Sequence, residues 1–335
     1  MIVVGGVTAA AIRVMGKARQ EGYKGRGMVT SLFQGLVHSI ADAGRELLDI
    51  RLGSGADRSI EGLAAVLLSQ KGEASGTALA RDMVDTYGDL DAEAKVGFFN
   101  HLASRYAPDM DAAAKLAEVF AAHPDNAGAA RLTAALEAPR QELFRRINMA
   151  PGGTWALVGM RADLLRLAEG TPELAAVDDD LRHLLASWFN RGFLDLHRID
   201  WRTPAVVLEK LIAYESVHAI QGWDDLRRRL ERDRRCFAFF HPALVDEPLI
   251  FVEVALTKGM AASIGSLLDL SSPPGNPAKA DAAIFYSINN CQDGLRGISF
   301  GNFLIKQVAH ELARDWPGIK TFATLSPVPG FRKWL

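Results

Sequence analysis

The sequence predicts an α+β fold in which an N-terminal all-helical bundle is followed by an α/β domain. Residues up to about 187 repeat apolar side chains with a helical period, and the following residues alternate them or group them in short runs. With 335 residues, 49% of them hydrophobic, the chain can bury a large core. We therefore expect a helical domain over 1–187 and an α/β domain over 188–335.

The helical half is recognised by its spacing and by its breaks. In "SLFQGLVHSIADAGRELL", Leu32, Leu36 and Ile40 recur about every 3.6 residues and mark one face of a helix. The segments "EGLAAVLLSQ", "TALARDMVDTYG", "AEAKVGFFNHLASRY" and "DAAAKLAEVFAAH" continue the pattern, separated by stretches rich in Gly, Pro and Asp. A Pro-Gly-Gly break at 151–153 precedes a further helix. The first half is thus predicted to be a bundle of helices.

Strand patterns begin after residue 188. The predicted strands are "GFLDLHRIDW", "RCFAFFH", "PLIFVEVALT", "AAIFYSI" and "TFATLS". Thr203 is expected to cap a helix that starts at Pro204 and ends near His218, where a helix C-terminus suits an imidazole. A second helix, "NFLIKQVAHELARDW", separates the last two strands. This order of elements indicates an α/β or α+β domain.

Charge and cysteine content narrow the function classes. The 38 basic and 40 acidic residues give a formal net charge of -2, which provides no reason to expect nucleic acid as a partner. The two cysteines match no metal-ligand spacing and favour a reducing compartment. No apolar stretch approaches the roughly 20 residues that span a bilayer. We expect a cytoplasmic protein, while an amphipathic targeting helix at the N-terminus stays an alternative.

The segment "AIFYSINNCQDGLRGISFGNFLIKQVAHEL" carries the main functional prediction. A strand leads into a loop with Gly294, Gly297 and Gly301, and a helix opens near Asn302. Glycines let backbone N–H groups approach a ligand, and a helix N-terminus adds free donors, so the loop can bind a pyrophosphate to which Arg296 adds a charge. The spacing differs from G-x-G-x-x-G and from the P-loop. A strand-to-helix turn without a ligand is the alternative.

The spacing from Arg296 to Gly301 before a helix resembles the coenzyme A loop of GNAT-type acyltransferases. The order of "INMAPGGTWALVGMRADLL", "WFNRGFLDLHRIDW", "HPALVDEPLIFVEVALT", "AAIFYSI", "NFLIKQVAHEL" and "LSPVPGFRKWL" resembles the malonyl-CoA decarboxylase family. The motifs cover the chain from about Ile147, and the earlier helices fit the family's helical domain by position and character.

This resemblance implies a helical oligomerisation domain followed by a GNAT-like catalytic domain. It implies conversion of malonyl-CoA to acetyl-CoA and carbon dioxide without an organic cofactor or a metal, and it implies no membrane or nucleic-acid partner. The resemblance assigns the catalytic role to Ser326, in "SPVPGF", with a histidine further downstream as its partner. The coenzyme A loop is then formed by Arg296, Gly297, Ile298, Ser299, Phe300, Gly301 and Asn302.

The sequence departs from the family at its C-terminal end. All eight histidines precede Ser326, so we expect the second half of the dyad, and the rest of the catalytic domain, to be missing. A serine without a base is a weak acid-base group, and the 335-residue chain is therefore predicted to turn over slowly. A fragment and a natural truncation both fit this expectation.

Two further functions stay open: acyl transfer from coenzyme A to an amine, and a non-catalytic assembly module that binds coenzyme A. Ser326 alone could also be a turn hydroxyl before Pro327. We interpret Arg227 to Arg235 as a salt-bridged helix surface, and Asp246 and Glu247 as a solvated turn. His310 is expected on an exposed helix face, and Cys236 and Cys291 as buried thiols.

Overall fold

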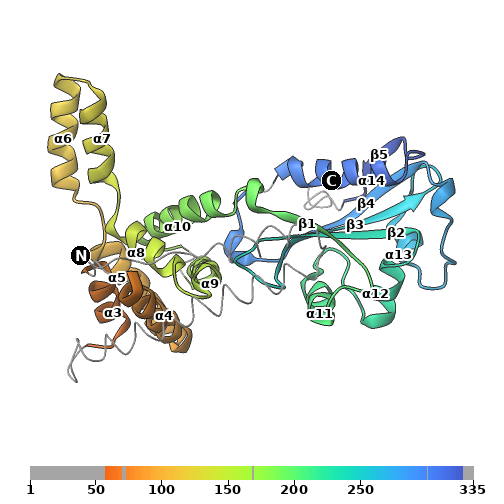
Figure 1. Ribbon diagram of the computed structural model, residues 1–335, viewed down its shortest axis with the longest axis horizontal. Coiled ribbons are helices and arrows are strands. Elements are labelled where there is room, and N and C mark those ends of the chain that lie inside the picture. The colour runs from red at the N-terminus through yellow and green to blue at the C-terminus, as the bar shows by residue number, and fades with distance from the viewer. Residues whose placement is uncertain (1–56, 70–72, 168–169, 300, 327–335) are drawn as a thin grey trace, which may run out of the picture. The chain divides into compact units, whose positions relative to one another are not determined.

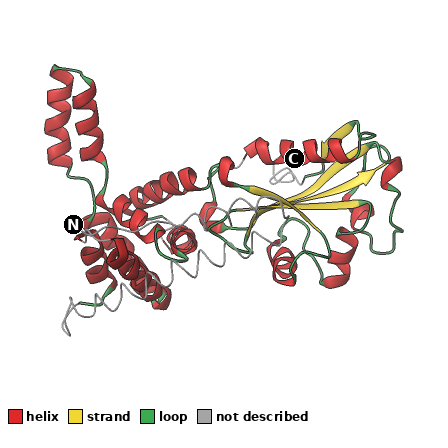
Figure 2. Cartoon of the chain, viewed as in Figure 1, coloured by secondary structure: helices red, strands yellow, loops and turns green. Residues whose placement is uncertain are grey.

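A computed structural model describes residues 57–69, 73–167, 170–299 and 301–326 (Figure 1). The helix predicted from "SLFQGLVHSIADAGRELL" lies outside the described residues. The chain divides into two compact units, residues 1–101 with 142–153 and residues 102–141 with 154–335. Between 57 and 187 the described residues form helices and turns and no strand, which confirms the prediction of a helical first half (Figure 2).

The first unit is a set of short helices around aromatic side chains. It contains α3 (Ile60–Ser69), α4 (Glu73–Asp89), most of α5 (Ala92–Arg105) and most of α8 (Pro139–Asn148). The rings of Tyr87, Phe98 and Phe99 lie with their centroids 6.1–6.3 Å apart in tilted and edge-on contacts. The guanidinium of Arg146 donates to the backbone carbonyls of Leu67 and Leu68, which satisfies carbonyls near the end of α3.

The second unit begins with a helical hairpin and continues with two longer helices. The hairpin consists of α6 (Met110–Ala122) and α7 (Asn126–Leu136), which lie side by side (Figure 1). The carboxylates of Asp109 and Asp125 cap their first turns by accepting hydrogen bonds from backbone N–H groups. The longer helices, α9 (Gly153–Leu167) and α10 (Ala175–Trp188), are joined through η1 (Pro172–Leu174).

A five-stranded sheet forms the rest of this unit, with the strands in chain order from β1 to β5. Its members are β1 (Asp195–Ile199), β2 (Arg234–Phe240), β3 (Pro248–Thr257), β4 (Ala282–Asn290) and β5 (Thr321–Thr324). The first four strands are antiparallel, and β5 pairs parallel with β4 after the crossover helix α14 (Gly301–Asp315). The mixed α+β class predicted from the sequence is therefore confirmed.

Helices cover both faces of this sheet, which explains why β3 reads as a continuous apolar run. On one face, Leu304, Val308 and Leu312 of α14 pack in a cluster with Val252 and Phe285 of the sheet, as their helical spacing predicted. On the other face lie α11 (Ala205–Tyr214) and α12 (Trp223–Arg229), whose apolar residues pack against Cys236, Ala238 and Phe251. Smaller elements connect the strands: η2 (Arg191–Phe193), α13 (Ile264–Leu268), η3 (Pro277–Lys279) and η4 (Asp293–Leu295).

Two predictions about α11 are wrong. Thr203 does not cap the helix: its hydroxyl accepts a hydrogen bond from the Asp200 N–H, and Pro204 occupies the N-cap position. The helix ends at Tyr214 rather than near His218, because the carboxylate of Glu215 accepts hydrogen bonds from the N–H groups of Val217 and His218. A side chain that bonds to nearby backbone groups competes with the helical ladder and turns the chain out of it.

Candidate coenzyme A and acyl site

The loop between β4 and α14 contains the residues predicted to bind coenzyme A. It starts with the single turn η4, and Gly297 follows with a φ of 79°, a conformation that favours glycine. Arg296, Gly297 and Ser299 are exposed and Ile298 is half-buried, while α14 begins at Gly301. Phe300 lies outside the described residues. The predicted strand, glycine loop and helix thus occur in the expected order.

Backbone N–H groups of this loop divide into two sets. Those of Leu295, Arg296 and Ile298 donate to carbonyls of the loop itself at 2.9–3.0 Å. For those of Gly297 and Ser299 we find no acceptor in the described part of the chain. The first N–H groups of α14 have no partner within the helix by construction, and the helix dipole adds a partial positive charge there. The loop therefore presents free donors to an anion.

Ser326 lies where β4 and β5 separate. The parallel pairing runs from Ala282 opposite Thr321 to Phe285 opposite Thr324, and the Leu325 N–H then donates to the Phe285 carbonyl at 2.8 Å. Beyond Phe285, β4 continues to Asn290 without a β5 partner among the described residues. Ser326 follows immediately and is exposed. The loop after β4 and the serine after β5 both follow the carboxyl ends of neighbouring parallel strands, which is where ligands bind in α/β sheets.

A bulge in β4 lies at this point of separation. The register with β3 pairs Glu253 with Ser287 and Val254 with Phe285, so Tyr286 is the additional residue. Phe285 and Ile288 pack in the cluster beneath α14, whereas Tyr286 packs in the cluster of α13 and Ser287 bonds to Glu215. The bulge therefore directs two consecutive side chains away from α14.

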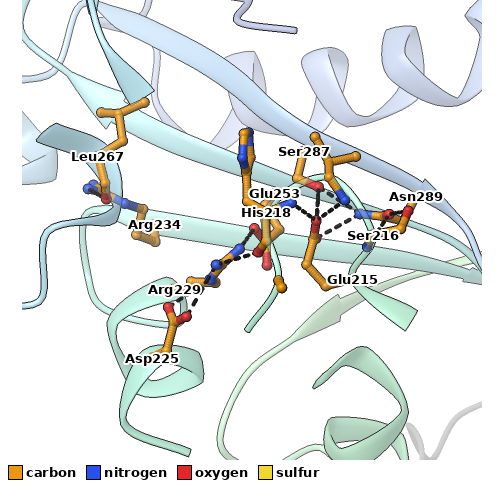
Figure 3. A network of polar contacts seen from close by, with 12 residues as sticks. Glu215, Ser216, His218, Asp225, Arg229, Arg234, Glu253, Leu267, Ser287 and Asn289 are labelled. Carbon is orange, nitrogen blue, oxygen red and sulfur yellow. Dashed lines mark hydrogen bonds and ion pairs between the residues drawn. The ribbon is translucent and has the colours of Figure 1, made fainter. Parts of the chain in front are cut away.

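These side chains join a buried polar network that sequence reasoning missed (Figure 3). The Glu215 carboxylate accepts hydrogen bonds from the Ser287 hydroxyl at 2.8 Å and from the Asn289 amide at 2.7 Å. The Asn289 carbonyl oxygen in turn accepts from the Ser216 N–H and hydroxyl. The network fastens the α11–α12 connection to β4. Two polar residues in an apolar strand were the available signal, but their partners lie more than 70 positions away.

An ion-pair group lies beside this network. Arg229 donates to Asp225 at 2.9 Å, to Glu253 at 2.8 Å and to the His218 carbonyl at 2.7 Å. Burial raises the pKa of Glu253 to about 7, although the Arg229 charge opposes that rise. Among the described residues, Glu253 Oε1, the Tyr286 hydroxyl and His218 Nε2 are buried without a hydrogen-bond partner. The sheet thus contains uncompensated polar groups near the β4 bulge.

The interpretation of Arg227 to Arg235 as a surface is wrong for most of the run. Arg228 and Arg234 are buried and both donate to the carboxylate of Asp233, which also accepts from the Gly275 N–H. Arg229 and Arg235 are buried too. The predicted ion pairs exist, but part of the run continues into β2, and the distant partners Glu253 and Gly275 could not be read from spacing.

The remaining candidates have structural surroundings. Glu247 is half-buried and pairs with Lys210 at 2.5 Å, and Asp246 is exposed in the turn. His310 is exposed on α14, as predicted, whereas Cys236 is buried and Cys291 half-buried. The described residues contain no group of three or more side chains suited to a metal ion. Among the described helices, none combines the length and apolar composition needed to cross a membrane.

Two family models match the chain. The model of the malonyl-CoA decarboxylase C-terminal domain matches residues 192–335, and that of the N-terminal domain matches residues 106–189. The chain is 35% identical to the mitochondrial malonyl-CoA decarboxylase of Rattus norvegicus over 295 residues, which cover 83% of this chain and 60% of that protein. It is 43% identical to the mitochondrial enzyme of Anser anser anser over 199 residues, covering 58% of this chain and 40% of that one.

Solved structures give the same result. The structure is similar to the crystal structure of malonyl-CoA decarboxylase from Rhodopseudomonas palustris, with a TM-score of 0.77, 55% identity, and coverage of 82% of this chain and 67% of that one. The enzyme from Agrobacterium vitis gives a TM-score of 0.79 and 53% identity with the same coverage. Both parts of the chain and the order of the site elements therefore place it in one family: the chain belongs to the malonyl-CoA decarboxylases.

Proposed function

We propose that this protein decarboxylates malonyl-CoA to acetyl-CoA and carbon dioxide. One observation carries the proposal: the free N–H groups of the β4–α14 loop lie on a strand neighbouring the one that leads to Ser326, at the point where these strands separate. Family membership supports the substrate, although the chain spans only 60% of the length of the rat relative.

We assign the diphosphate of coenzyme A to the segment Arg296–Asn302. The N–H groups of Gly297 and Ser299 and the first turn of α14 supply neutral donors, and the exposed side chain of Arg296 supplies a positive charge. The gap between β4 and β5 beyond Phe285 leaves backbone groups of β4 for the pantetheine arm. The acyl group would then extend toward Ser326.

Decarboxylation breaks the bond between the α-carbon and the carboxylate carbon. The electron pair passes into the thioester as an enolate, carbon dioxide leaves, and a proton must then be added to the α-carbon. A site with little water favours neutral carbon dioxide over the solvated carboxylate, and donors near the enolate oxygen lower the barrier. Ser326 donates or relays the proton in this proposal, with a histidine downstream of Leu335 as the predicted partner.

We further propose that the helical segment mediates self-association, with a domain boundary near residue 187 that the matches to 106–189 and 192–335 support. A net charge of -2 supports the absence of a nucleic-acid partner. The cytoplasmic location stays a prediction, while the rat and goose relatives are named as mitochondrial.

The test is a product balance from malonyl-CoA. The protein is incubated with malonyl-CoA, and acetyl-CoA and carbon dioxide are quantified by chromatography and isotope counting. We expect equal amounts of both products, formed slowly by this chain. The Ser326→Ala variant should lower the rate by roughly 100-fold or more, the typical contribution of a positioned acid-base group, with unchanged affinity for coenzyme A.

A matched control is Ser187→Ala, because Ser187 is an exposed serine on α10 whose hydroxyl donates only to the His183 carbonyl. Full activity of Ser326→Ala would remove that residue from the mechanism. Acylation of an added amine, without free carbon dioxide, would favour acyl transfer instead. Tight binding of coenzyme A without any product would favour the non-catalytic module.

A further inference from the structure

Helix α9 contacts the candidate coenzyme A loop directly. The guanidinium of Arg161, 2% exposed, donates from Nη1 to the Gly294 carbonyl at 2.7 Å and to the Arg296 carbonyl at 2.8 Å. A side-chain carbon at Gly294 would lie 1.9 Å from the Val158 carbonyl oxygen, so the loop fits against α9 only with glycine at that position. Two positions of α9 therefore fix the course of the loop.

The contact with Arg161 also fixes the direction of one donor. In a planar trans peptide the carbonyl and the following N–H point in opposite directions. Since the Arg296 carbonyl points to Arg161, the Gly297 N–H points away from α9. This is one of the two loop N–H groups for which the described residues offer no acceptor. Arg161 thus orients a donor that the protein itself does not use.

The charge of Arg161 is balanced within the protein. Its Nε donates to the Asp178 carboxylate on α10 at 2.8 Å. The guanidinium therefore acts by its geometry, because one rigid fork reaches a carboxylate and two carbonyls at once. A lysine ammonium is a single point charge on a flexible chain and cannot reproduce that fork.

We propose that Arg161 is a positioning residue for the diphosphate of coenzyme A, and that α9 is part of the coenzyme A site. This inference rests on the proposed function, since it requires the loop to bind coenzyme A. It joins a helix from the segment matched by the N-terminal family model to a loop in the segment matched by the C-terminal model. The helical segment then contributes to substrate affinity as well as to assembly.

The test compares two ligands that differ in the diphosphate. Binding of coenzyme A is measured by calorimetry and binding of pantetheine, which lacks the diphosphate, by ligand-detected NMR, for the unmodified chain and for Arg161→Lys. We expect Arg161→Lys to weaken coenzyme A binding by about 10-fold, the typical effect of a misdirected hydrogen bond to a charged group, and to leave pantetheine binding unchanged.

Arg140→Lys is the matched control. Arg140 is equally buried, donates from Nε to Asp180 at 2.6 Å, and reaches the carbonyls of Leu102, Tyr106 and Ala176, but it does not contact the loop. It should lower the unfolding temperature as Arg161→Lys does and retain the affinity for coenzyme A. An equal loss of coenzyme A binding in both variants, or a parallel loss of pantetheine binding in Arg161→Lys, would overturn the proposal.

A second variant decides the case where Arg161→Lys does not fold. Gly294→Ala moves the loop from α9 by steric contact alone, and the same selective loss of coenzyme A is expected. Unchanged coenzyme A binding in the folded variants would refute the positioning role while leaving the proposed function intact. If the unmodified chain binds no coenzyme A, the proposed function fails first and this inference fails with it.

Discussion

Glu253 lies within β3 with 1% of its surface exposed, and Arg229 is its ion-pair partner at 2.8 Å. Burial raises its pKa from an ordinary value of 4.5 to about 7, because the Arg229 charge compensates only in part. Between these two pH values the folded protein binds more protons at this position than the unfolded chain does. The stabilisation from this group is therefore complete below pH 4.5 and is lost as the pH rises through 7.

We expect Glu253→Gln to flatten the pH dependence of stability. In urea denaturation, the free energy of unfolding of the unmodified chain should fall between about pH 5 and pH 8 by roughly 3 kcal/mol more than that of the variant. The amide cannot titrate, so the difference in slope isolates this one group from all others. Parallel curves for the two proteins would show that Glu253 titrates normally and that the surroundings of β3 are wetter than the structure indicates.

At the scale of elements, the connection between α11 and α12 depends on a single carboxylate. Glu215 accepts hydrogen bonds from two backbone N–H groups of the connection and from Ser287 and Asn289 of β4. The connection thus receives its conformation from a strand that follows more than 70 residues later. Removing an acceptor of this kind leaves several buried donors without a partner, which costs more than the hydrogen bonds themselves contribute.

Glu215→Ala should therefore destabilise the protein by roughly 3–5 kcal/mol, as expected for breaking a buried charged network. The N–H groups of Val217 and His218 should exchange with solvent much faster in hydrogen-exchange measurements. The control is Glu209→Ala, an exposed glutamate on α11, where a change within about 0.5 kcal/mol is expected. Equal effects of the two substitutions would contradict the role assigned to the network.

At the scale of the whole molecule, the contact of Arg161 with the loop predicts how ligand binding spreads through the second unit. Saturating coenzyme A should slow amide exchange in residues 154–167 of α9 together with residues 294–299, because both share the same hydrogen bonds. The α6–α7 hairpin has no such contact and should keep its exchange rate. Protection confined to the loop, with α9 unchanged, would contradict the coupling.

Much of the fold could be predicted because its elements are defined by local pattern. The apolar runs that became β3 and β4 and the spacing of Leu304, Val308 and Leu312 on α14 correctly predicted both the elements and their buried faces. Predictions failed where a distant partner decides, as at Thr203, at the end of α11 and along the arginine run. The loop residues and Ser326 came from motif order, and their roles stay proposals because no contact within the protein defines them.

The sequence by itself determined the order of helices and strands, the glycine loop between β4 and α14, and the family, because periodicity and motif order are carried by neighbouring residues. The tertiary structure alone decided that Arg161 holds that loop, that Glu215 binds Ser287 and Asn289, and that Glu253 is buried against Arg229. These partners are separated by 24 to 135 positions. The physical reason is that hydrogen bonds and ion pairs depend on distances in space, which only the packing of the elements on the sheet brings to bonding range.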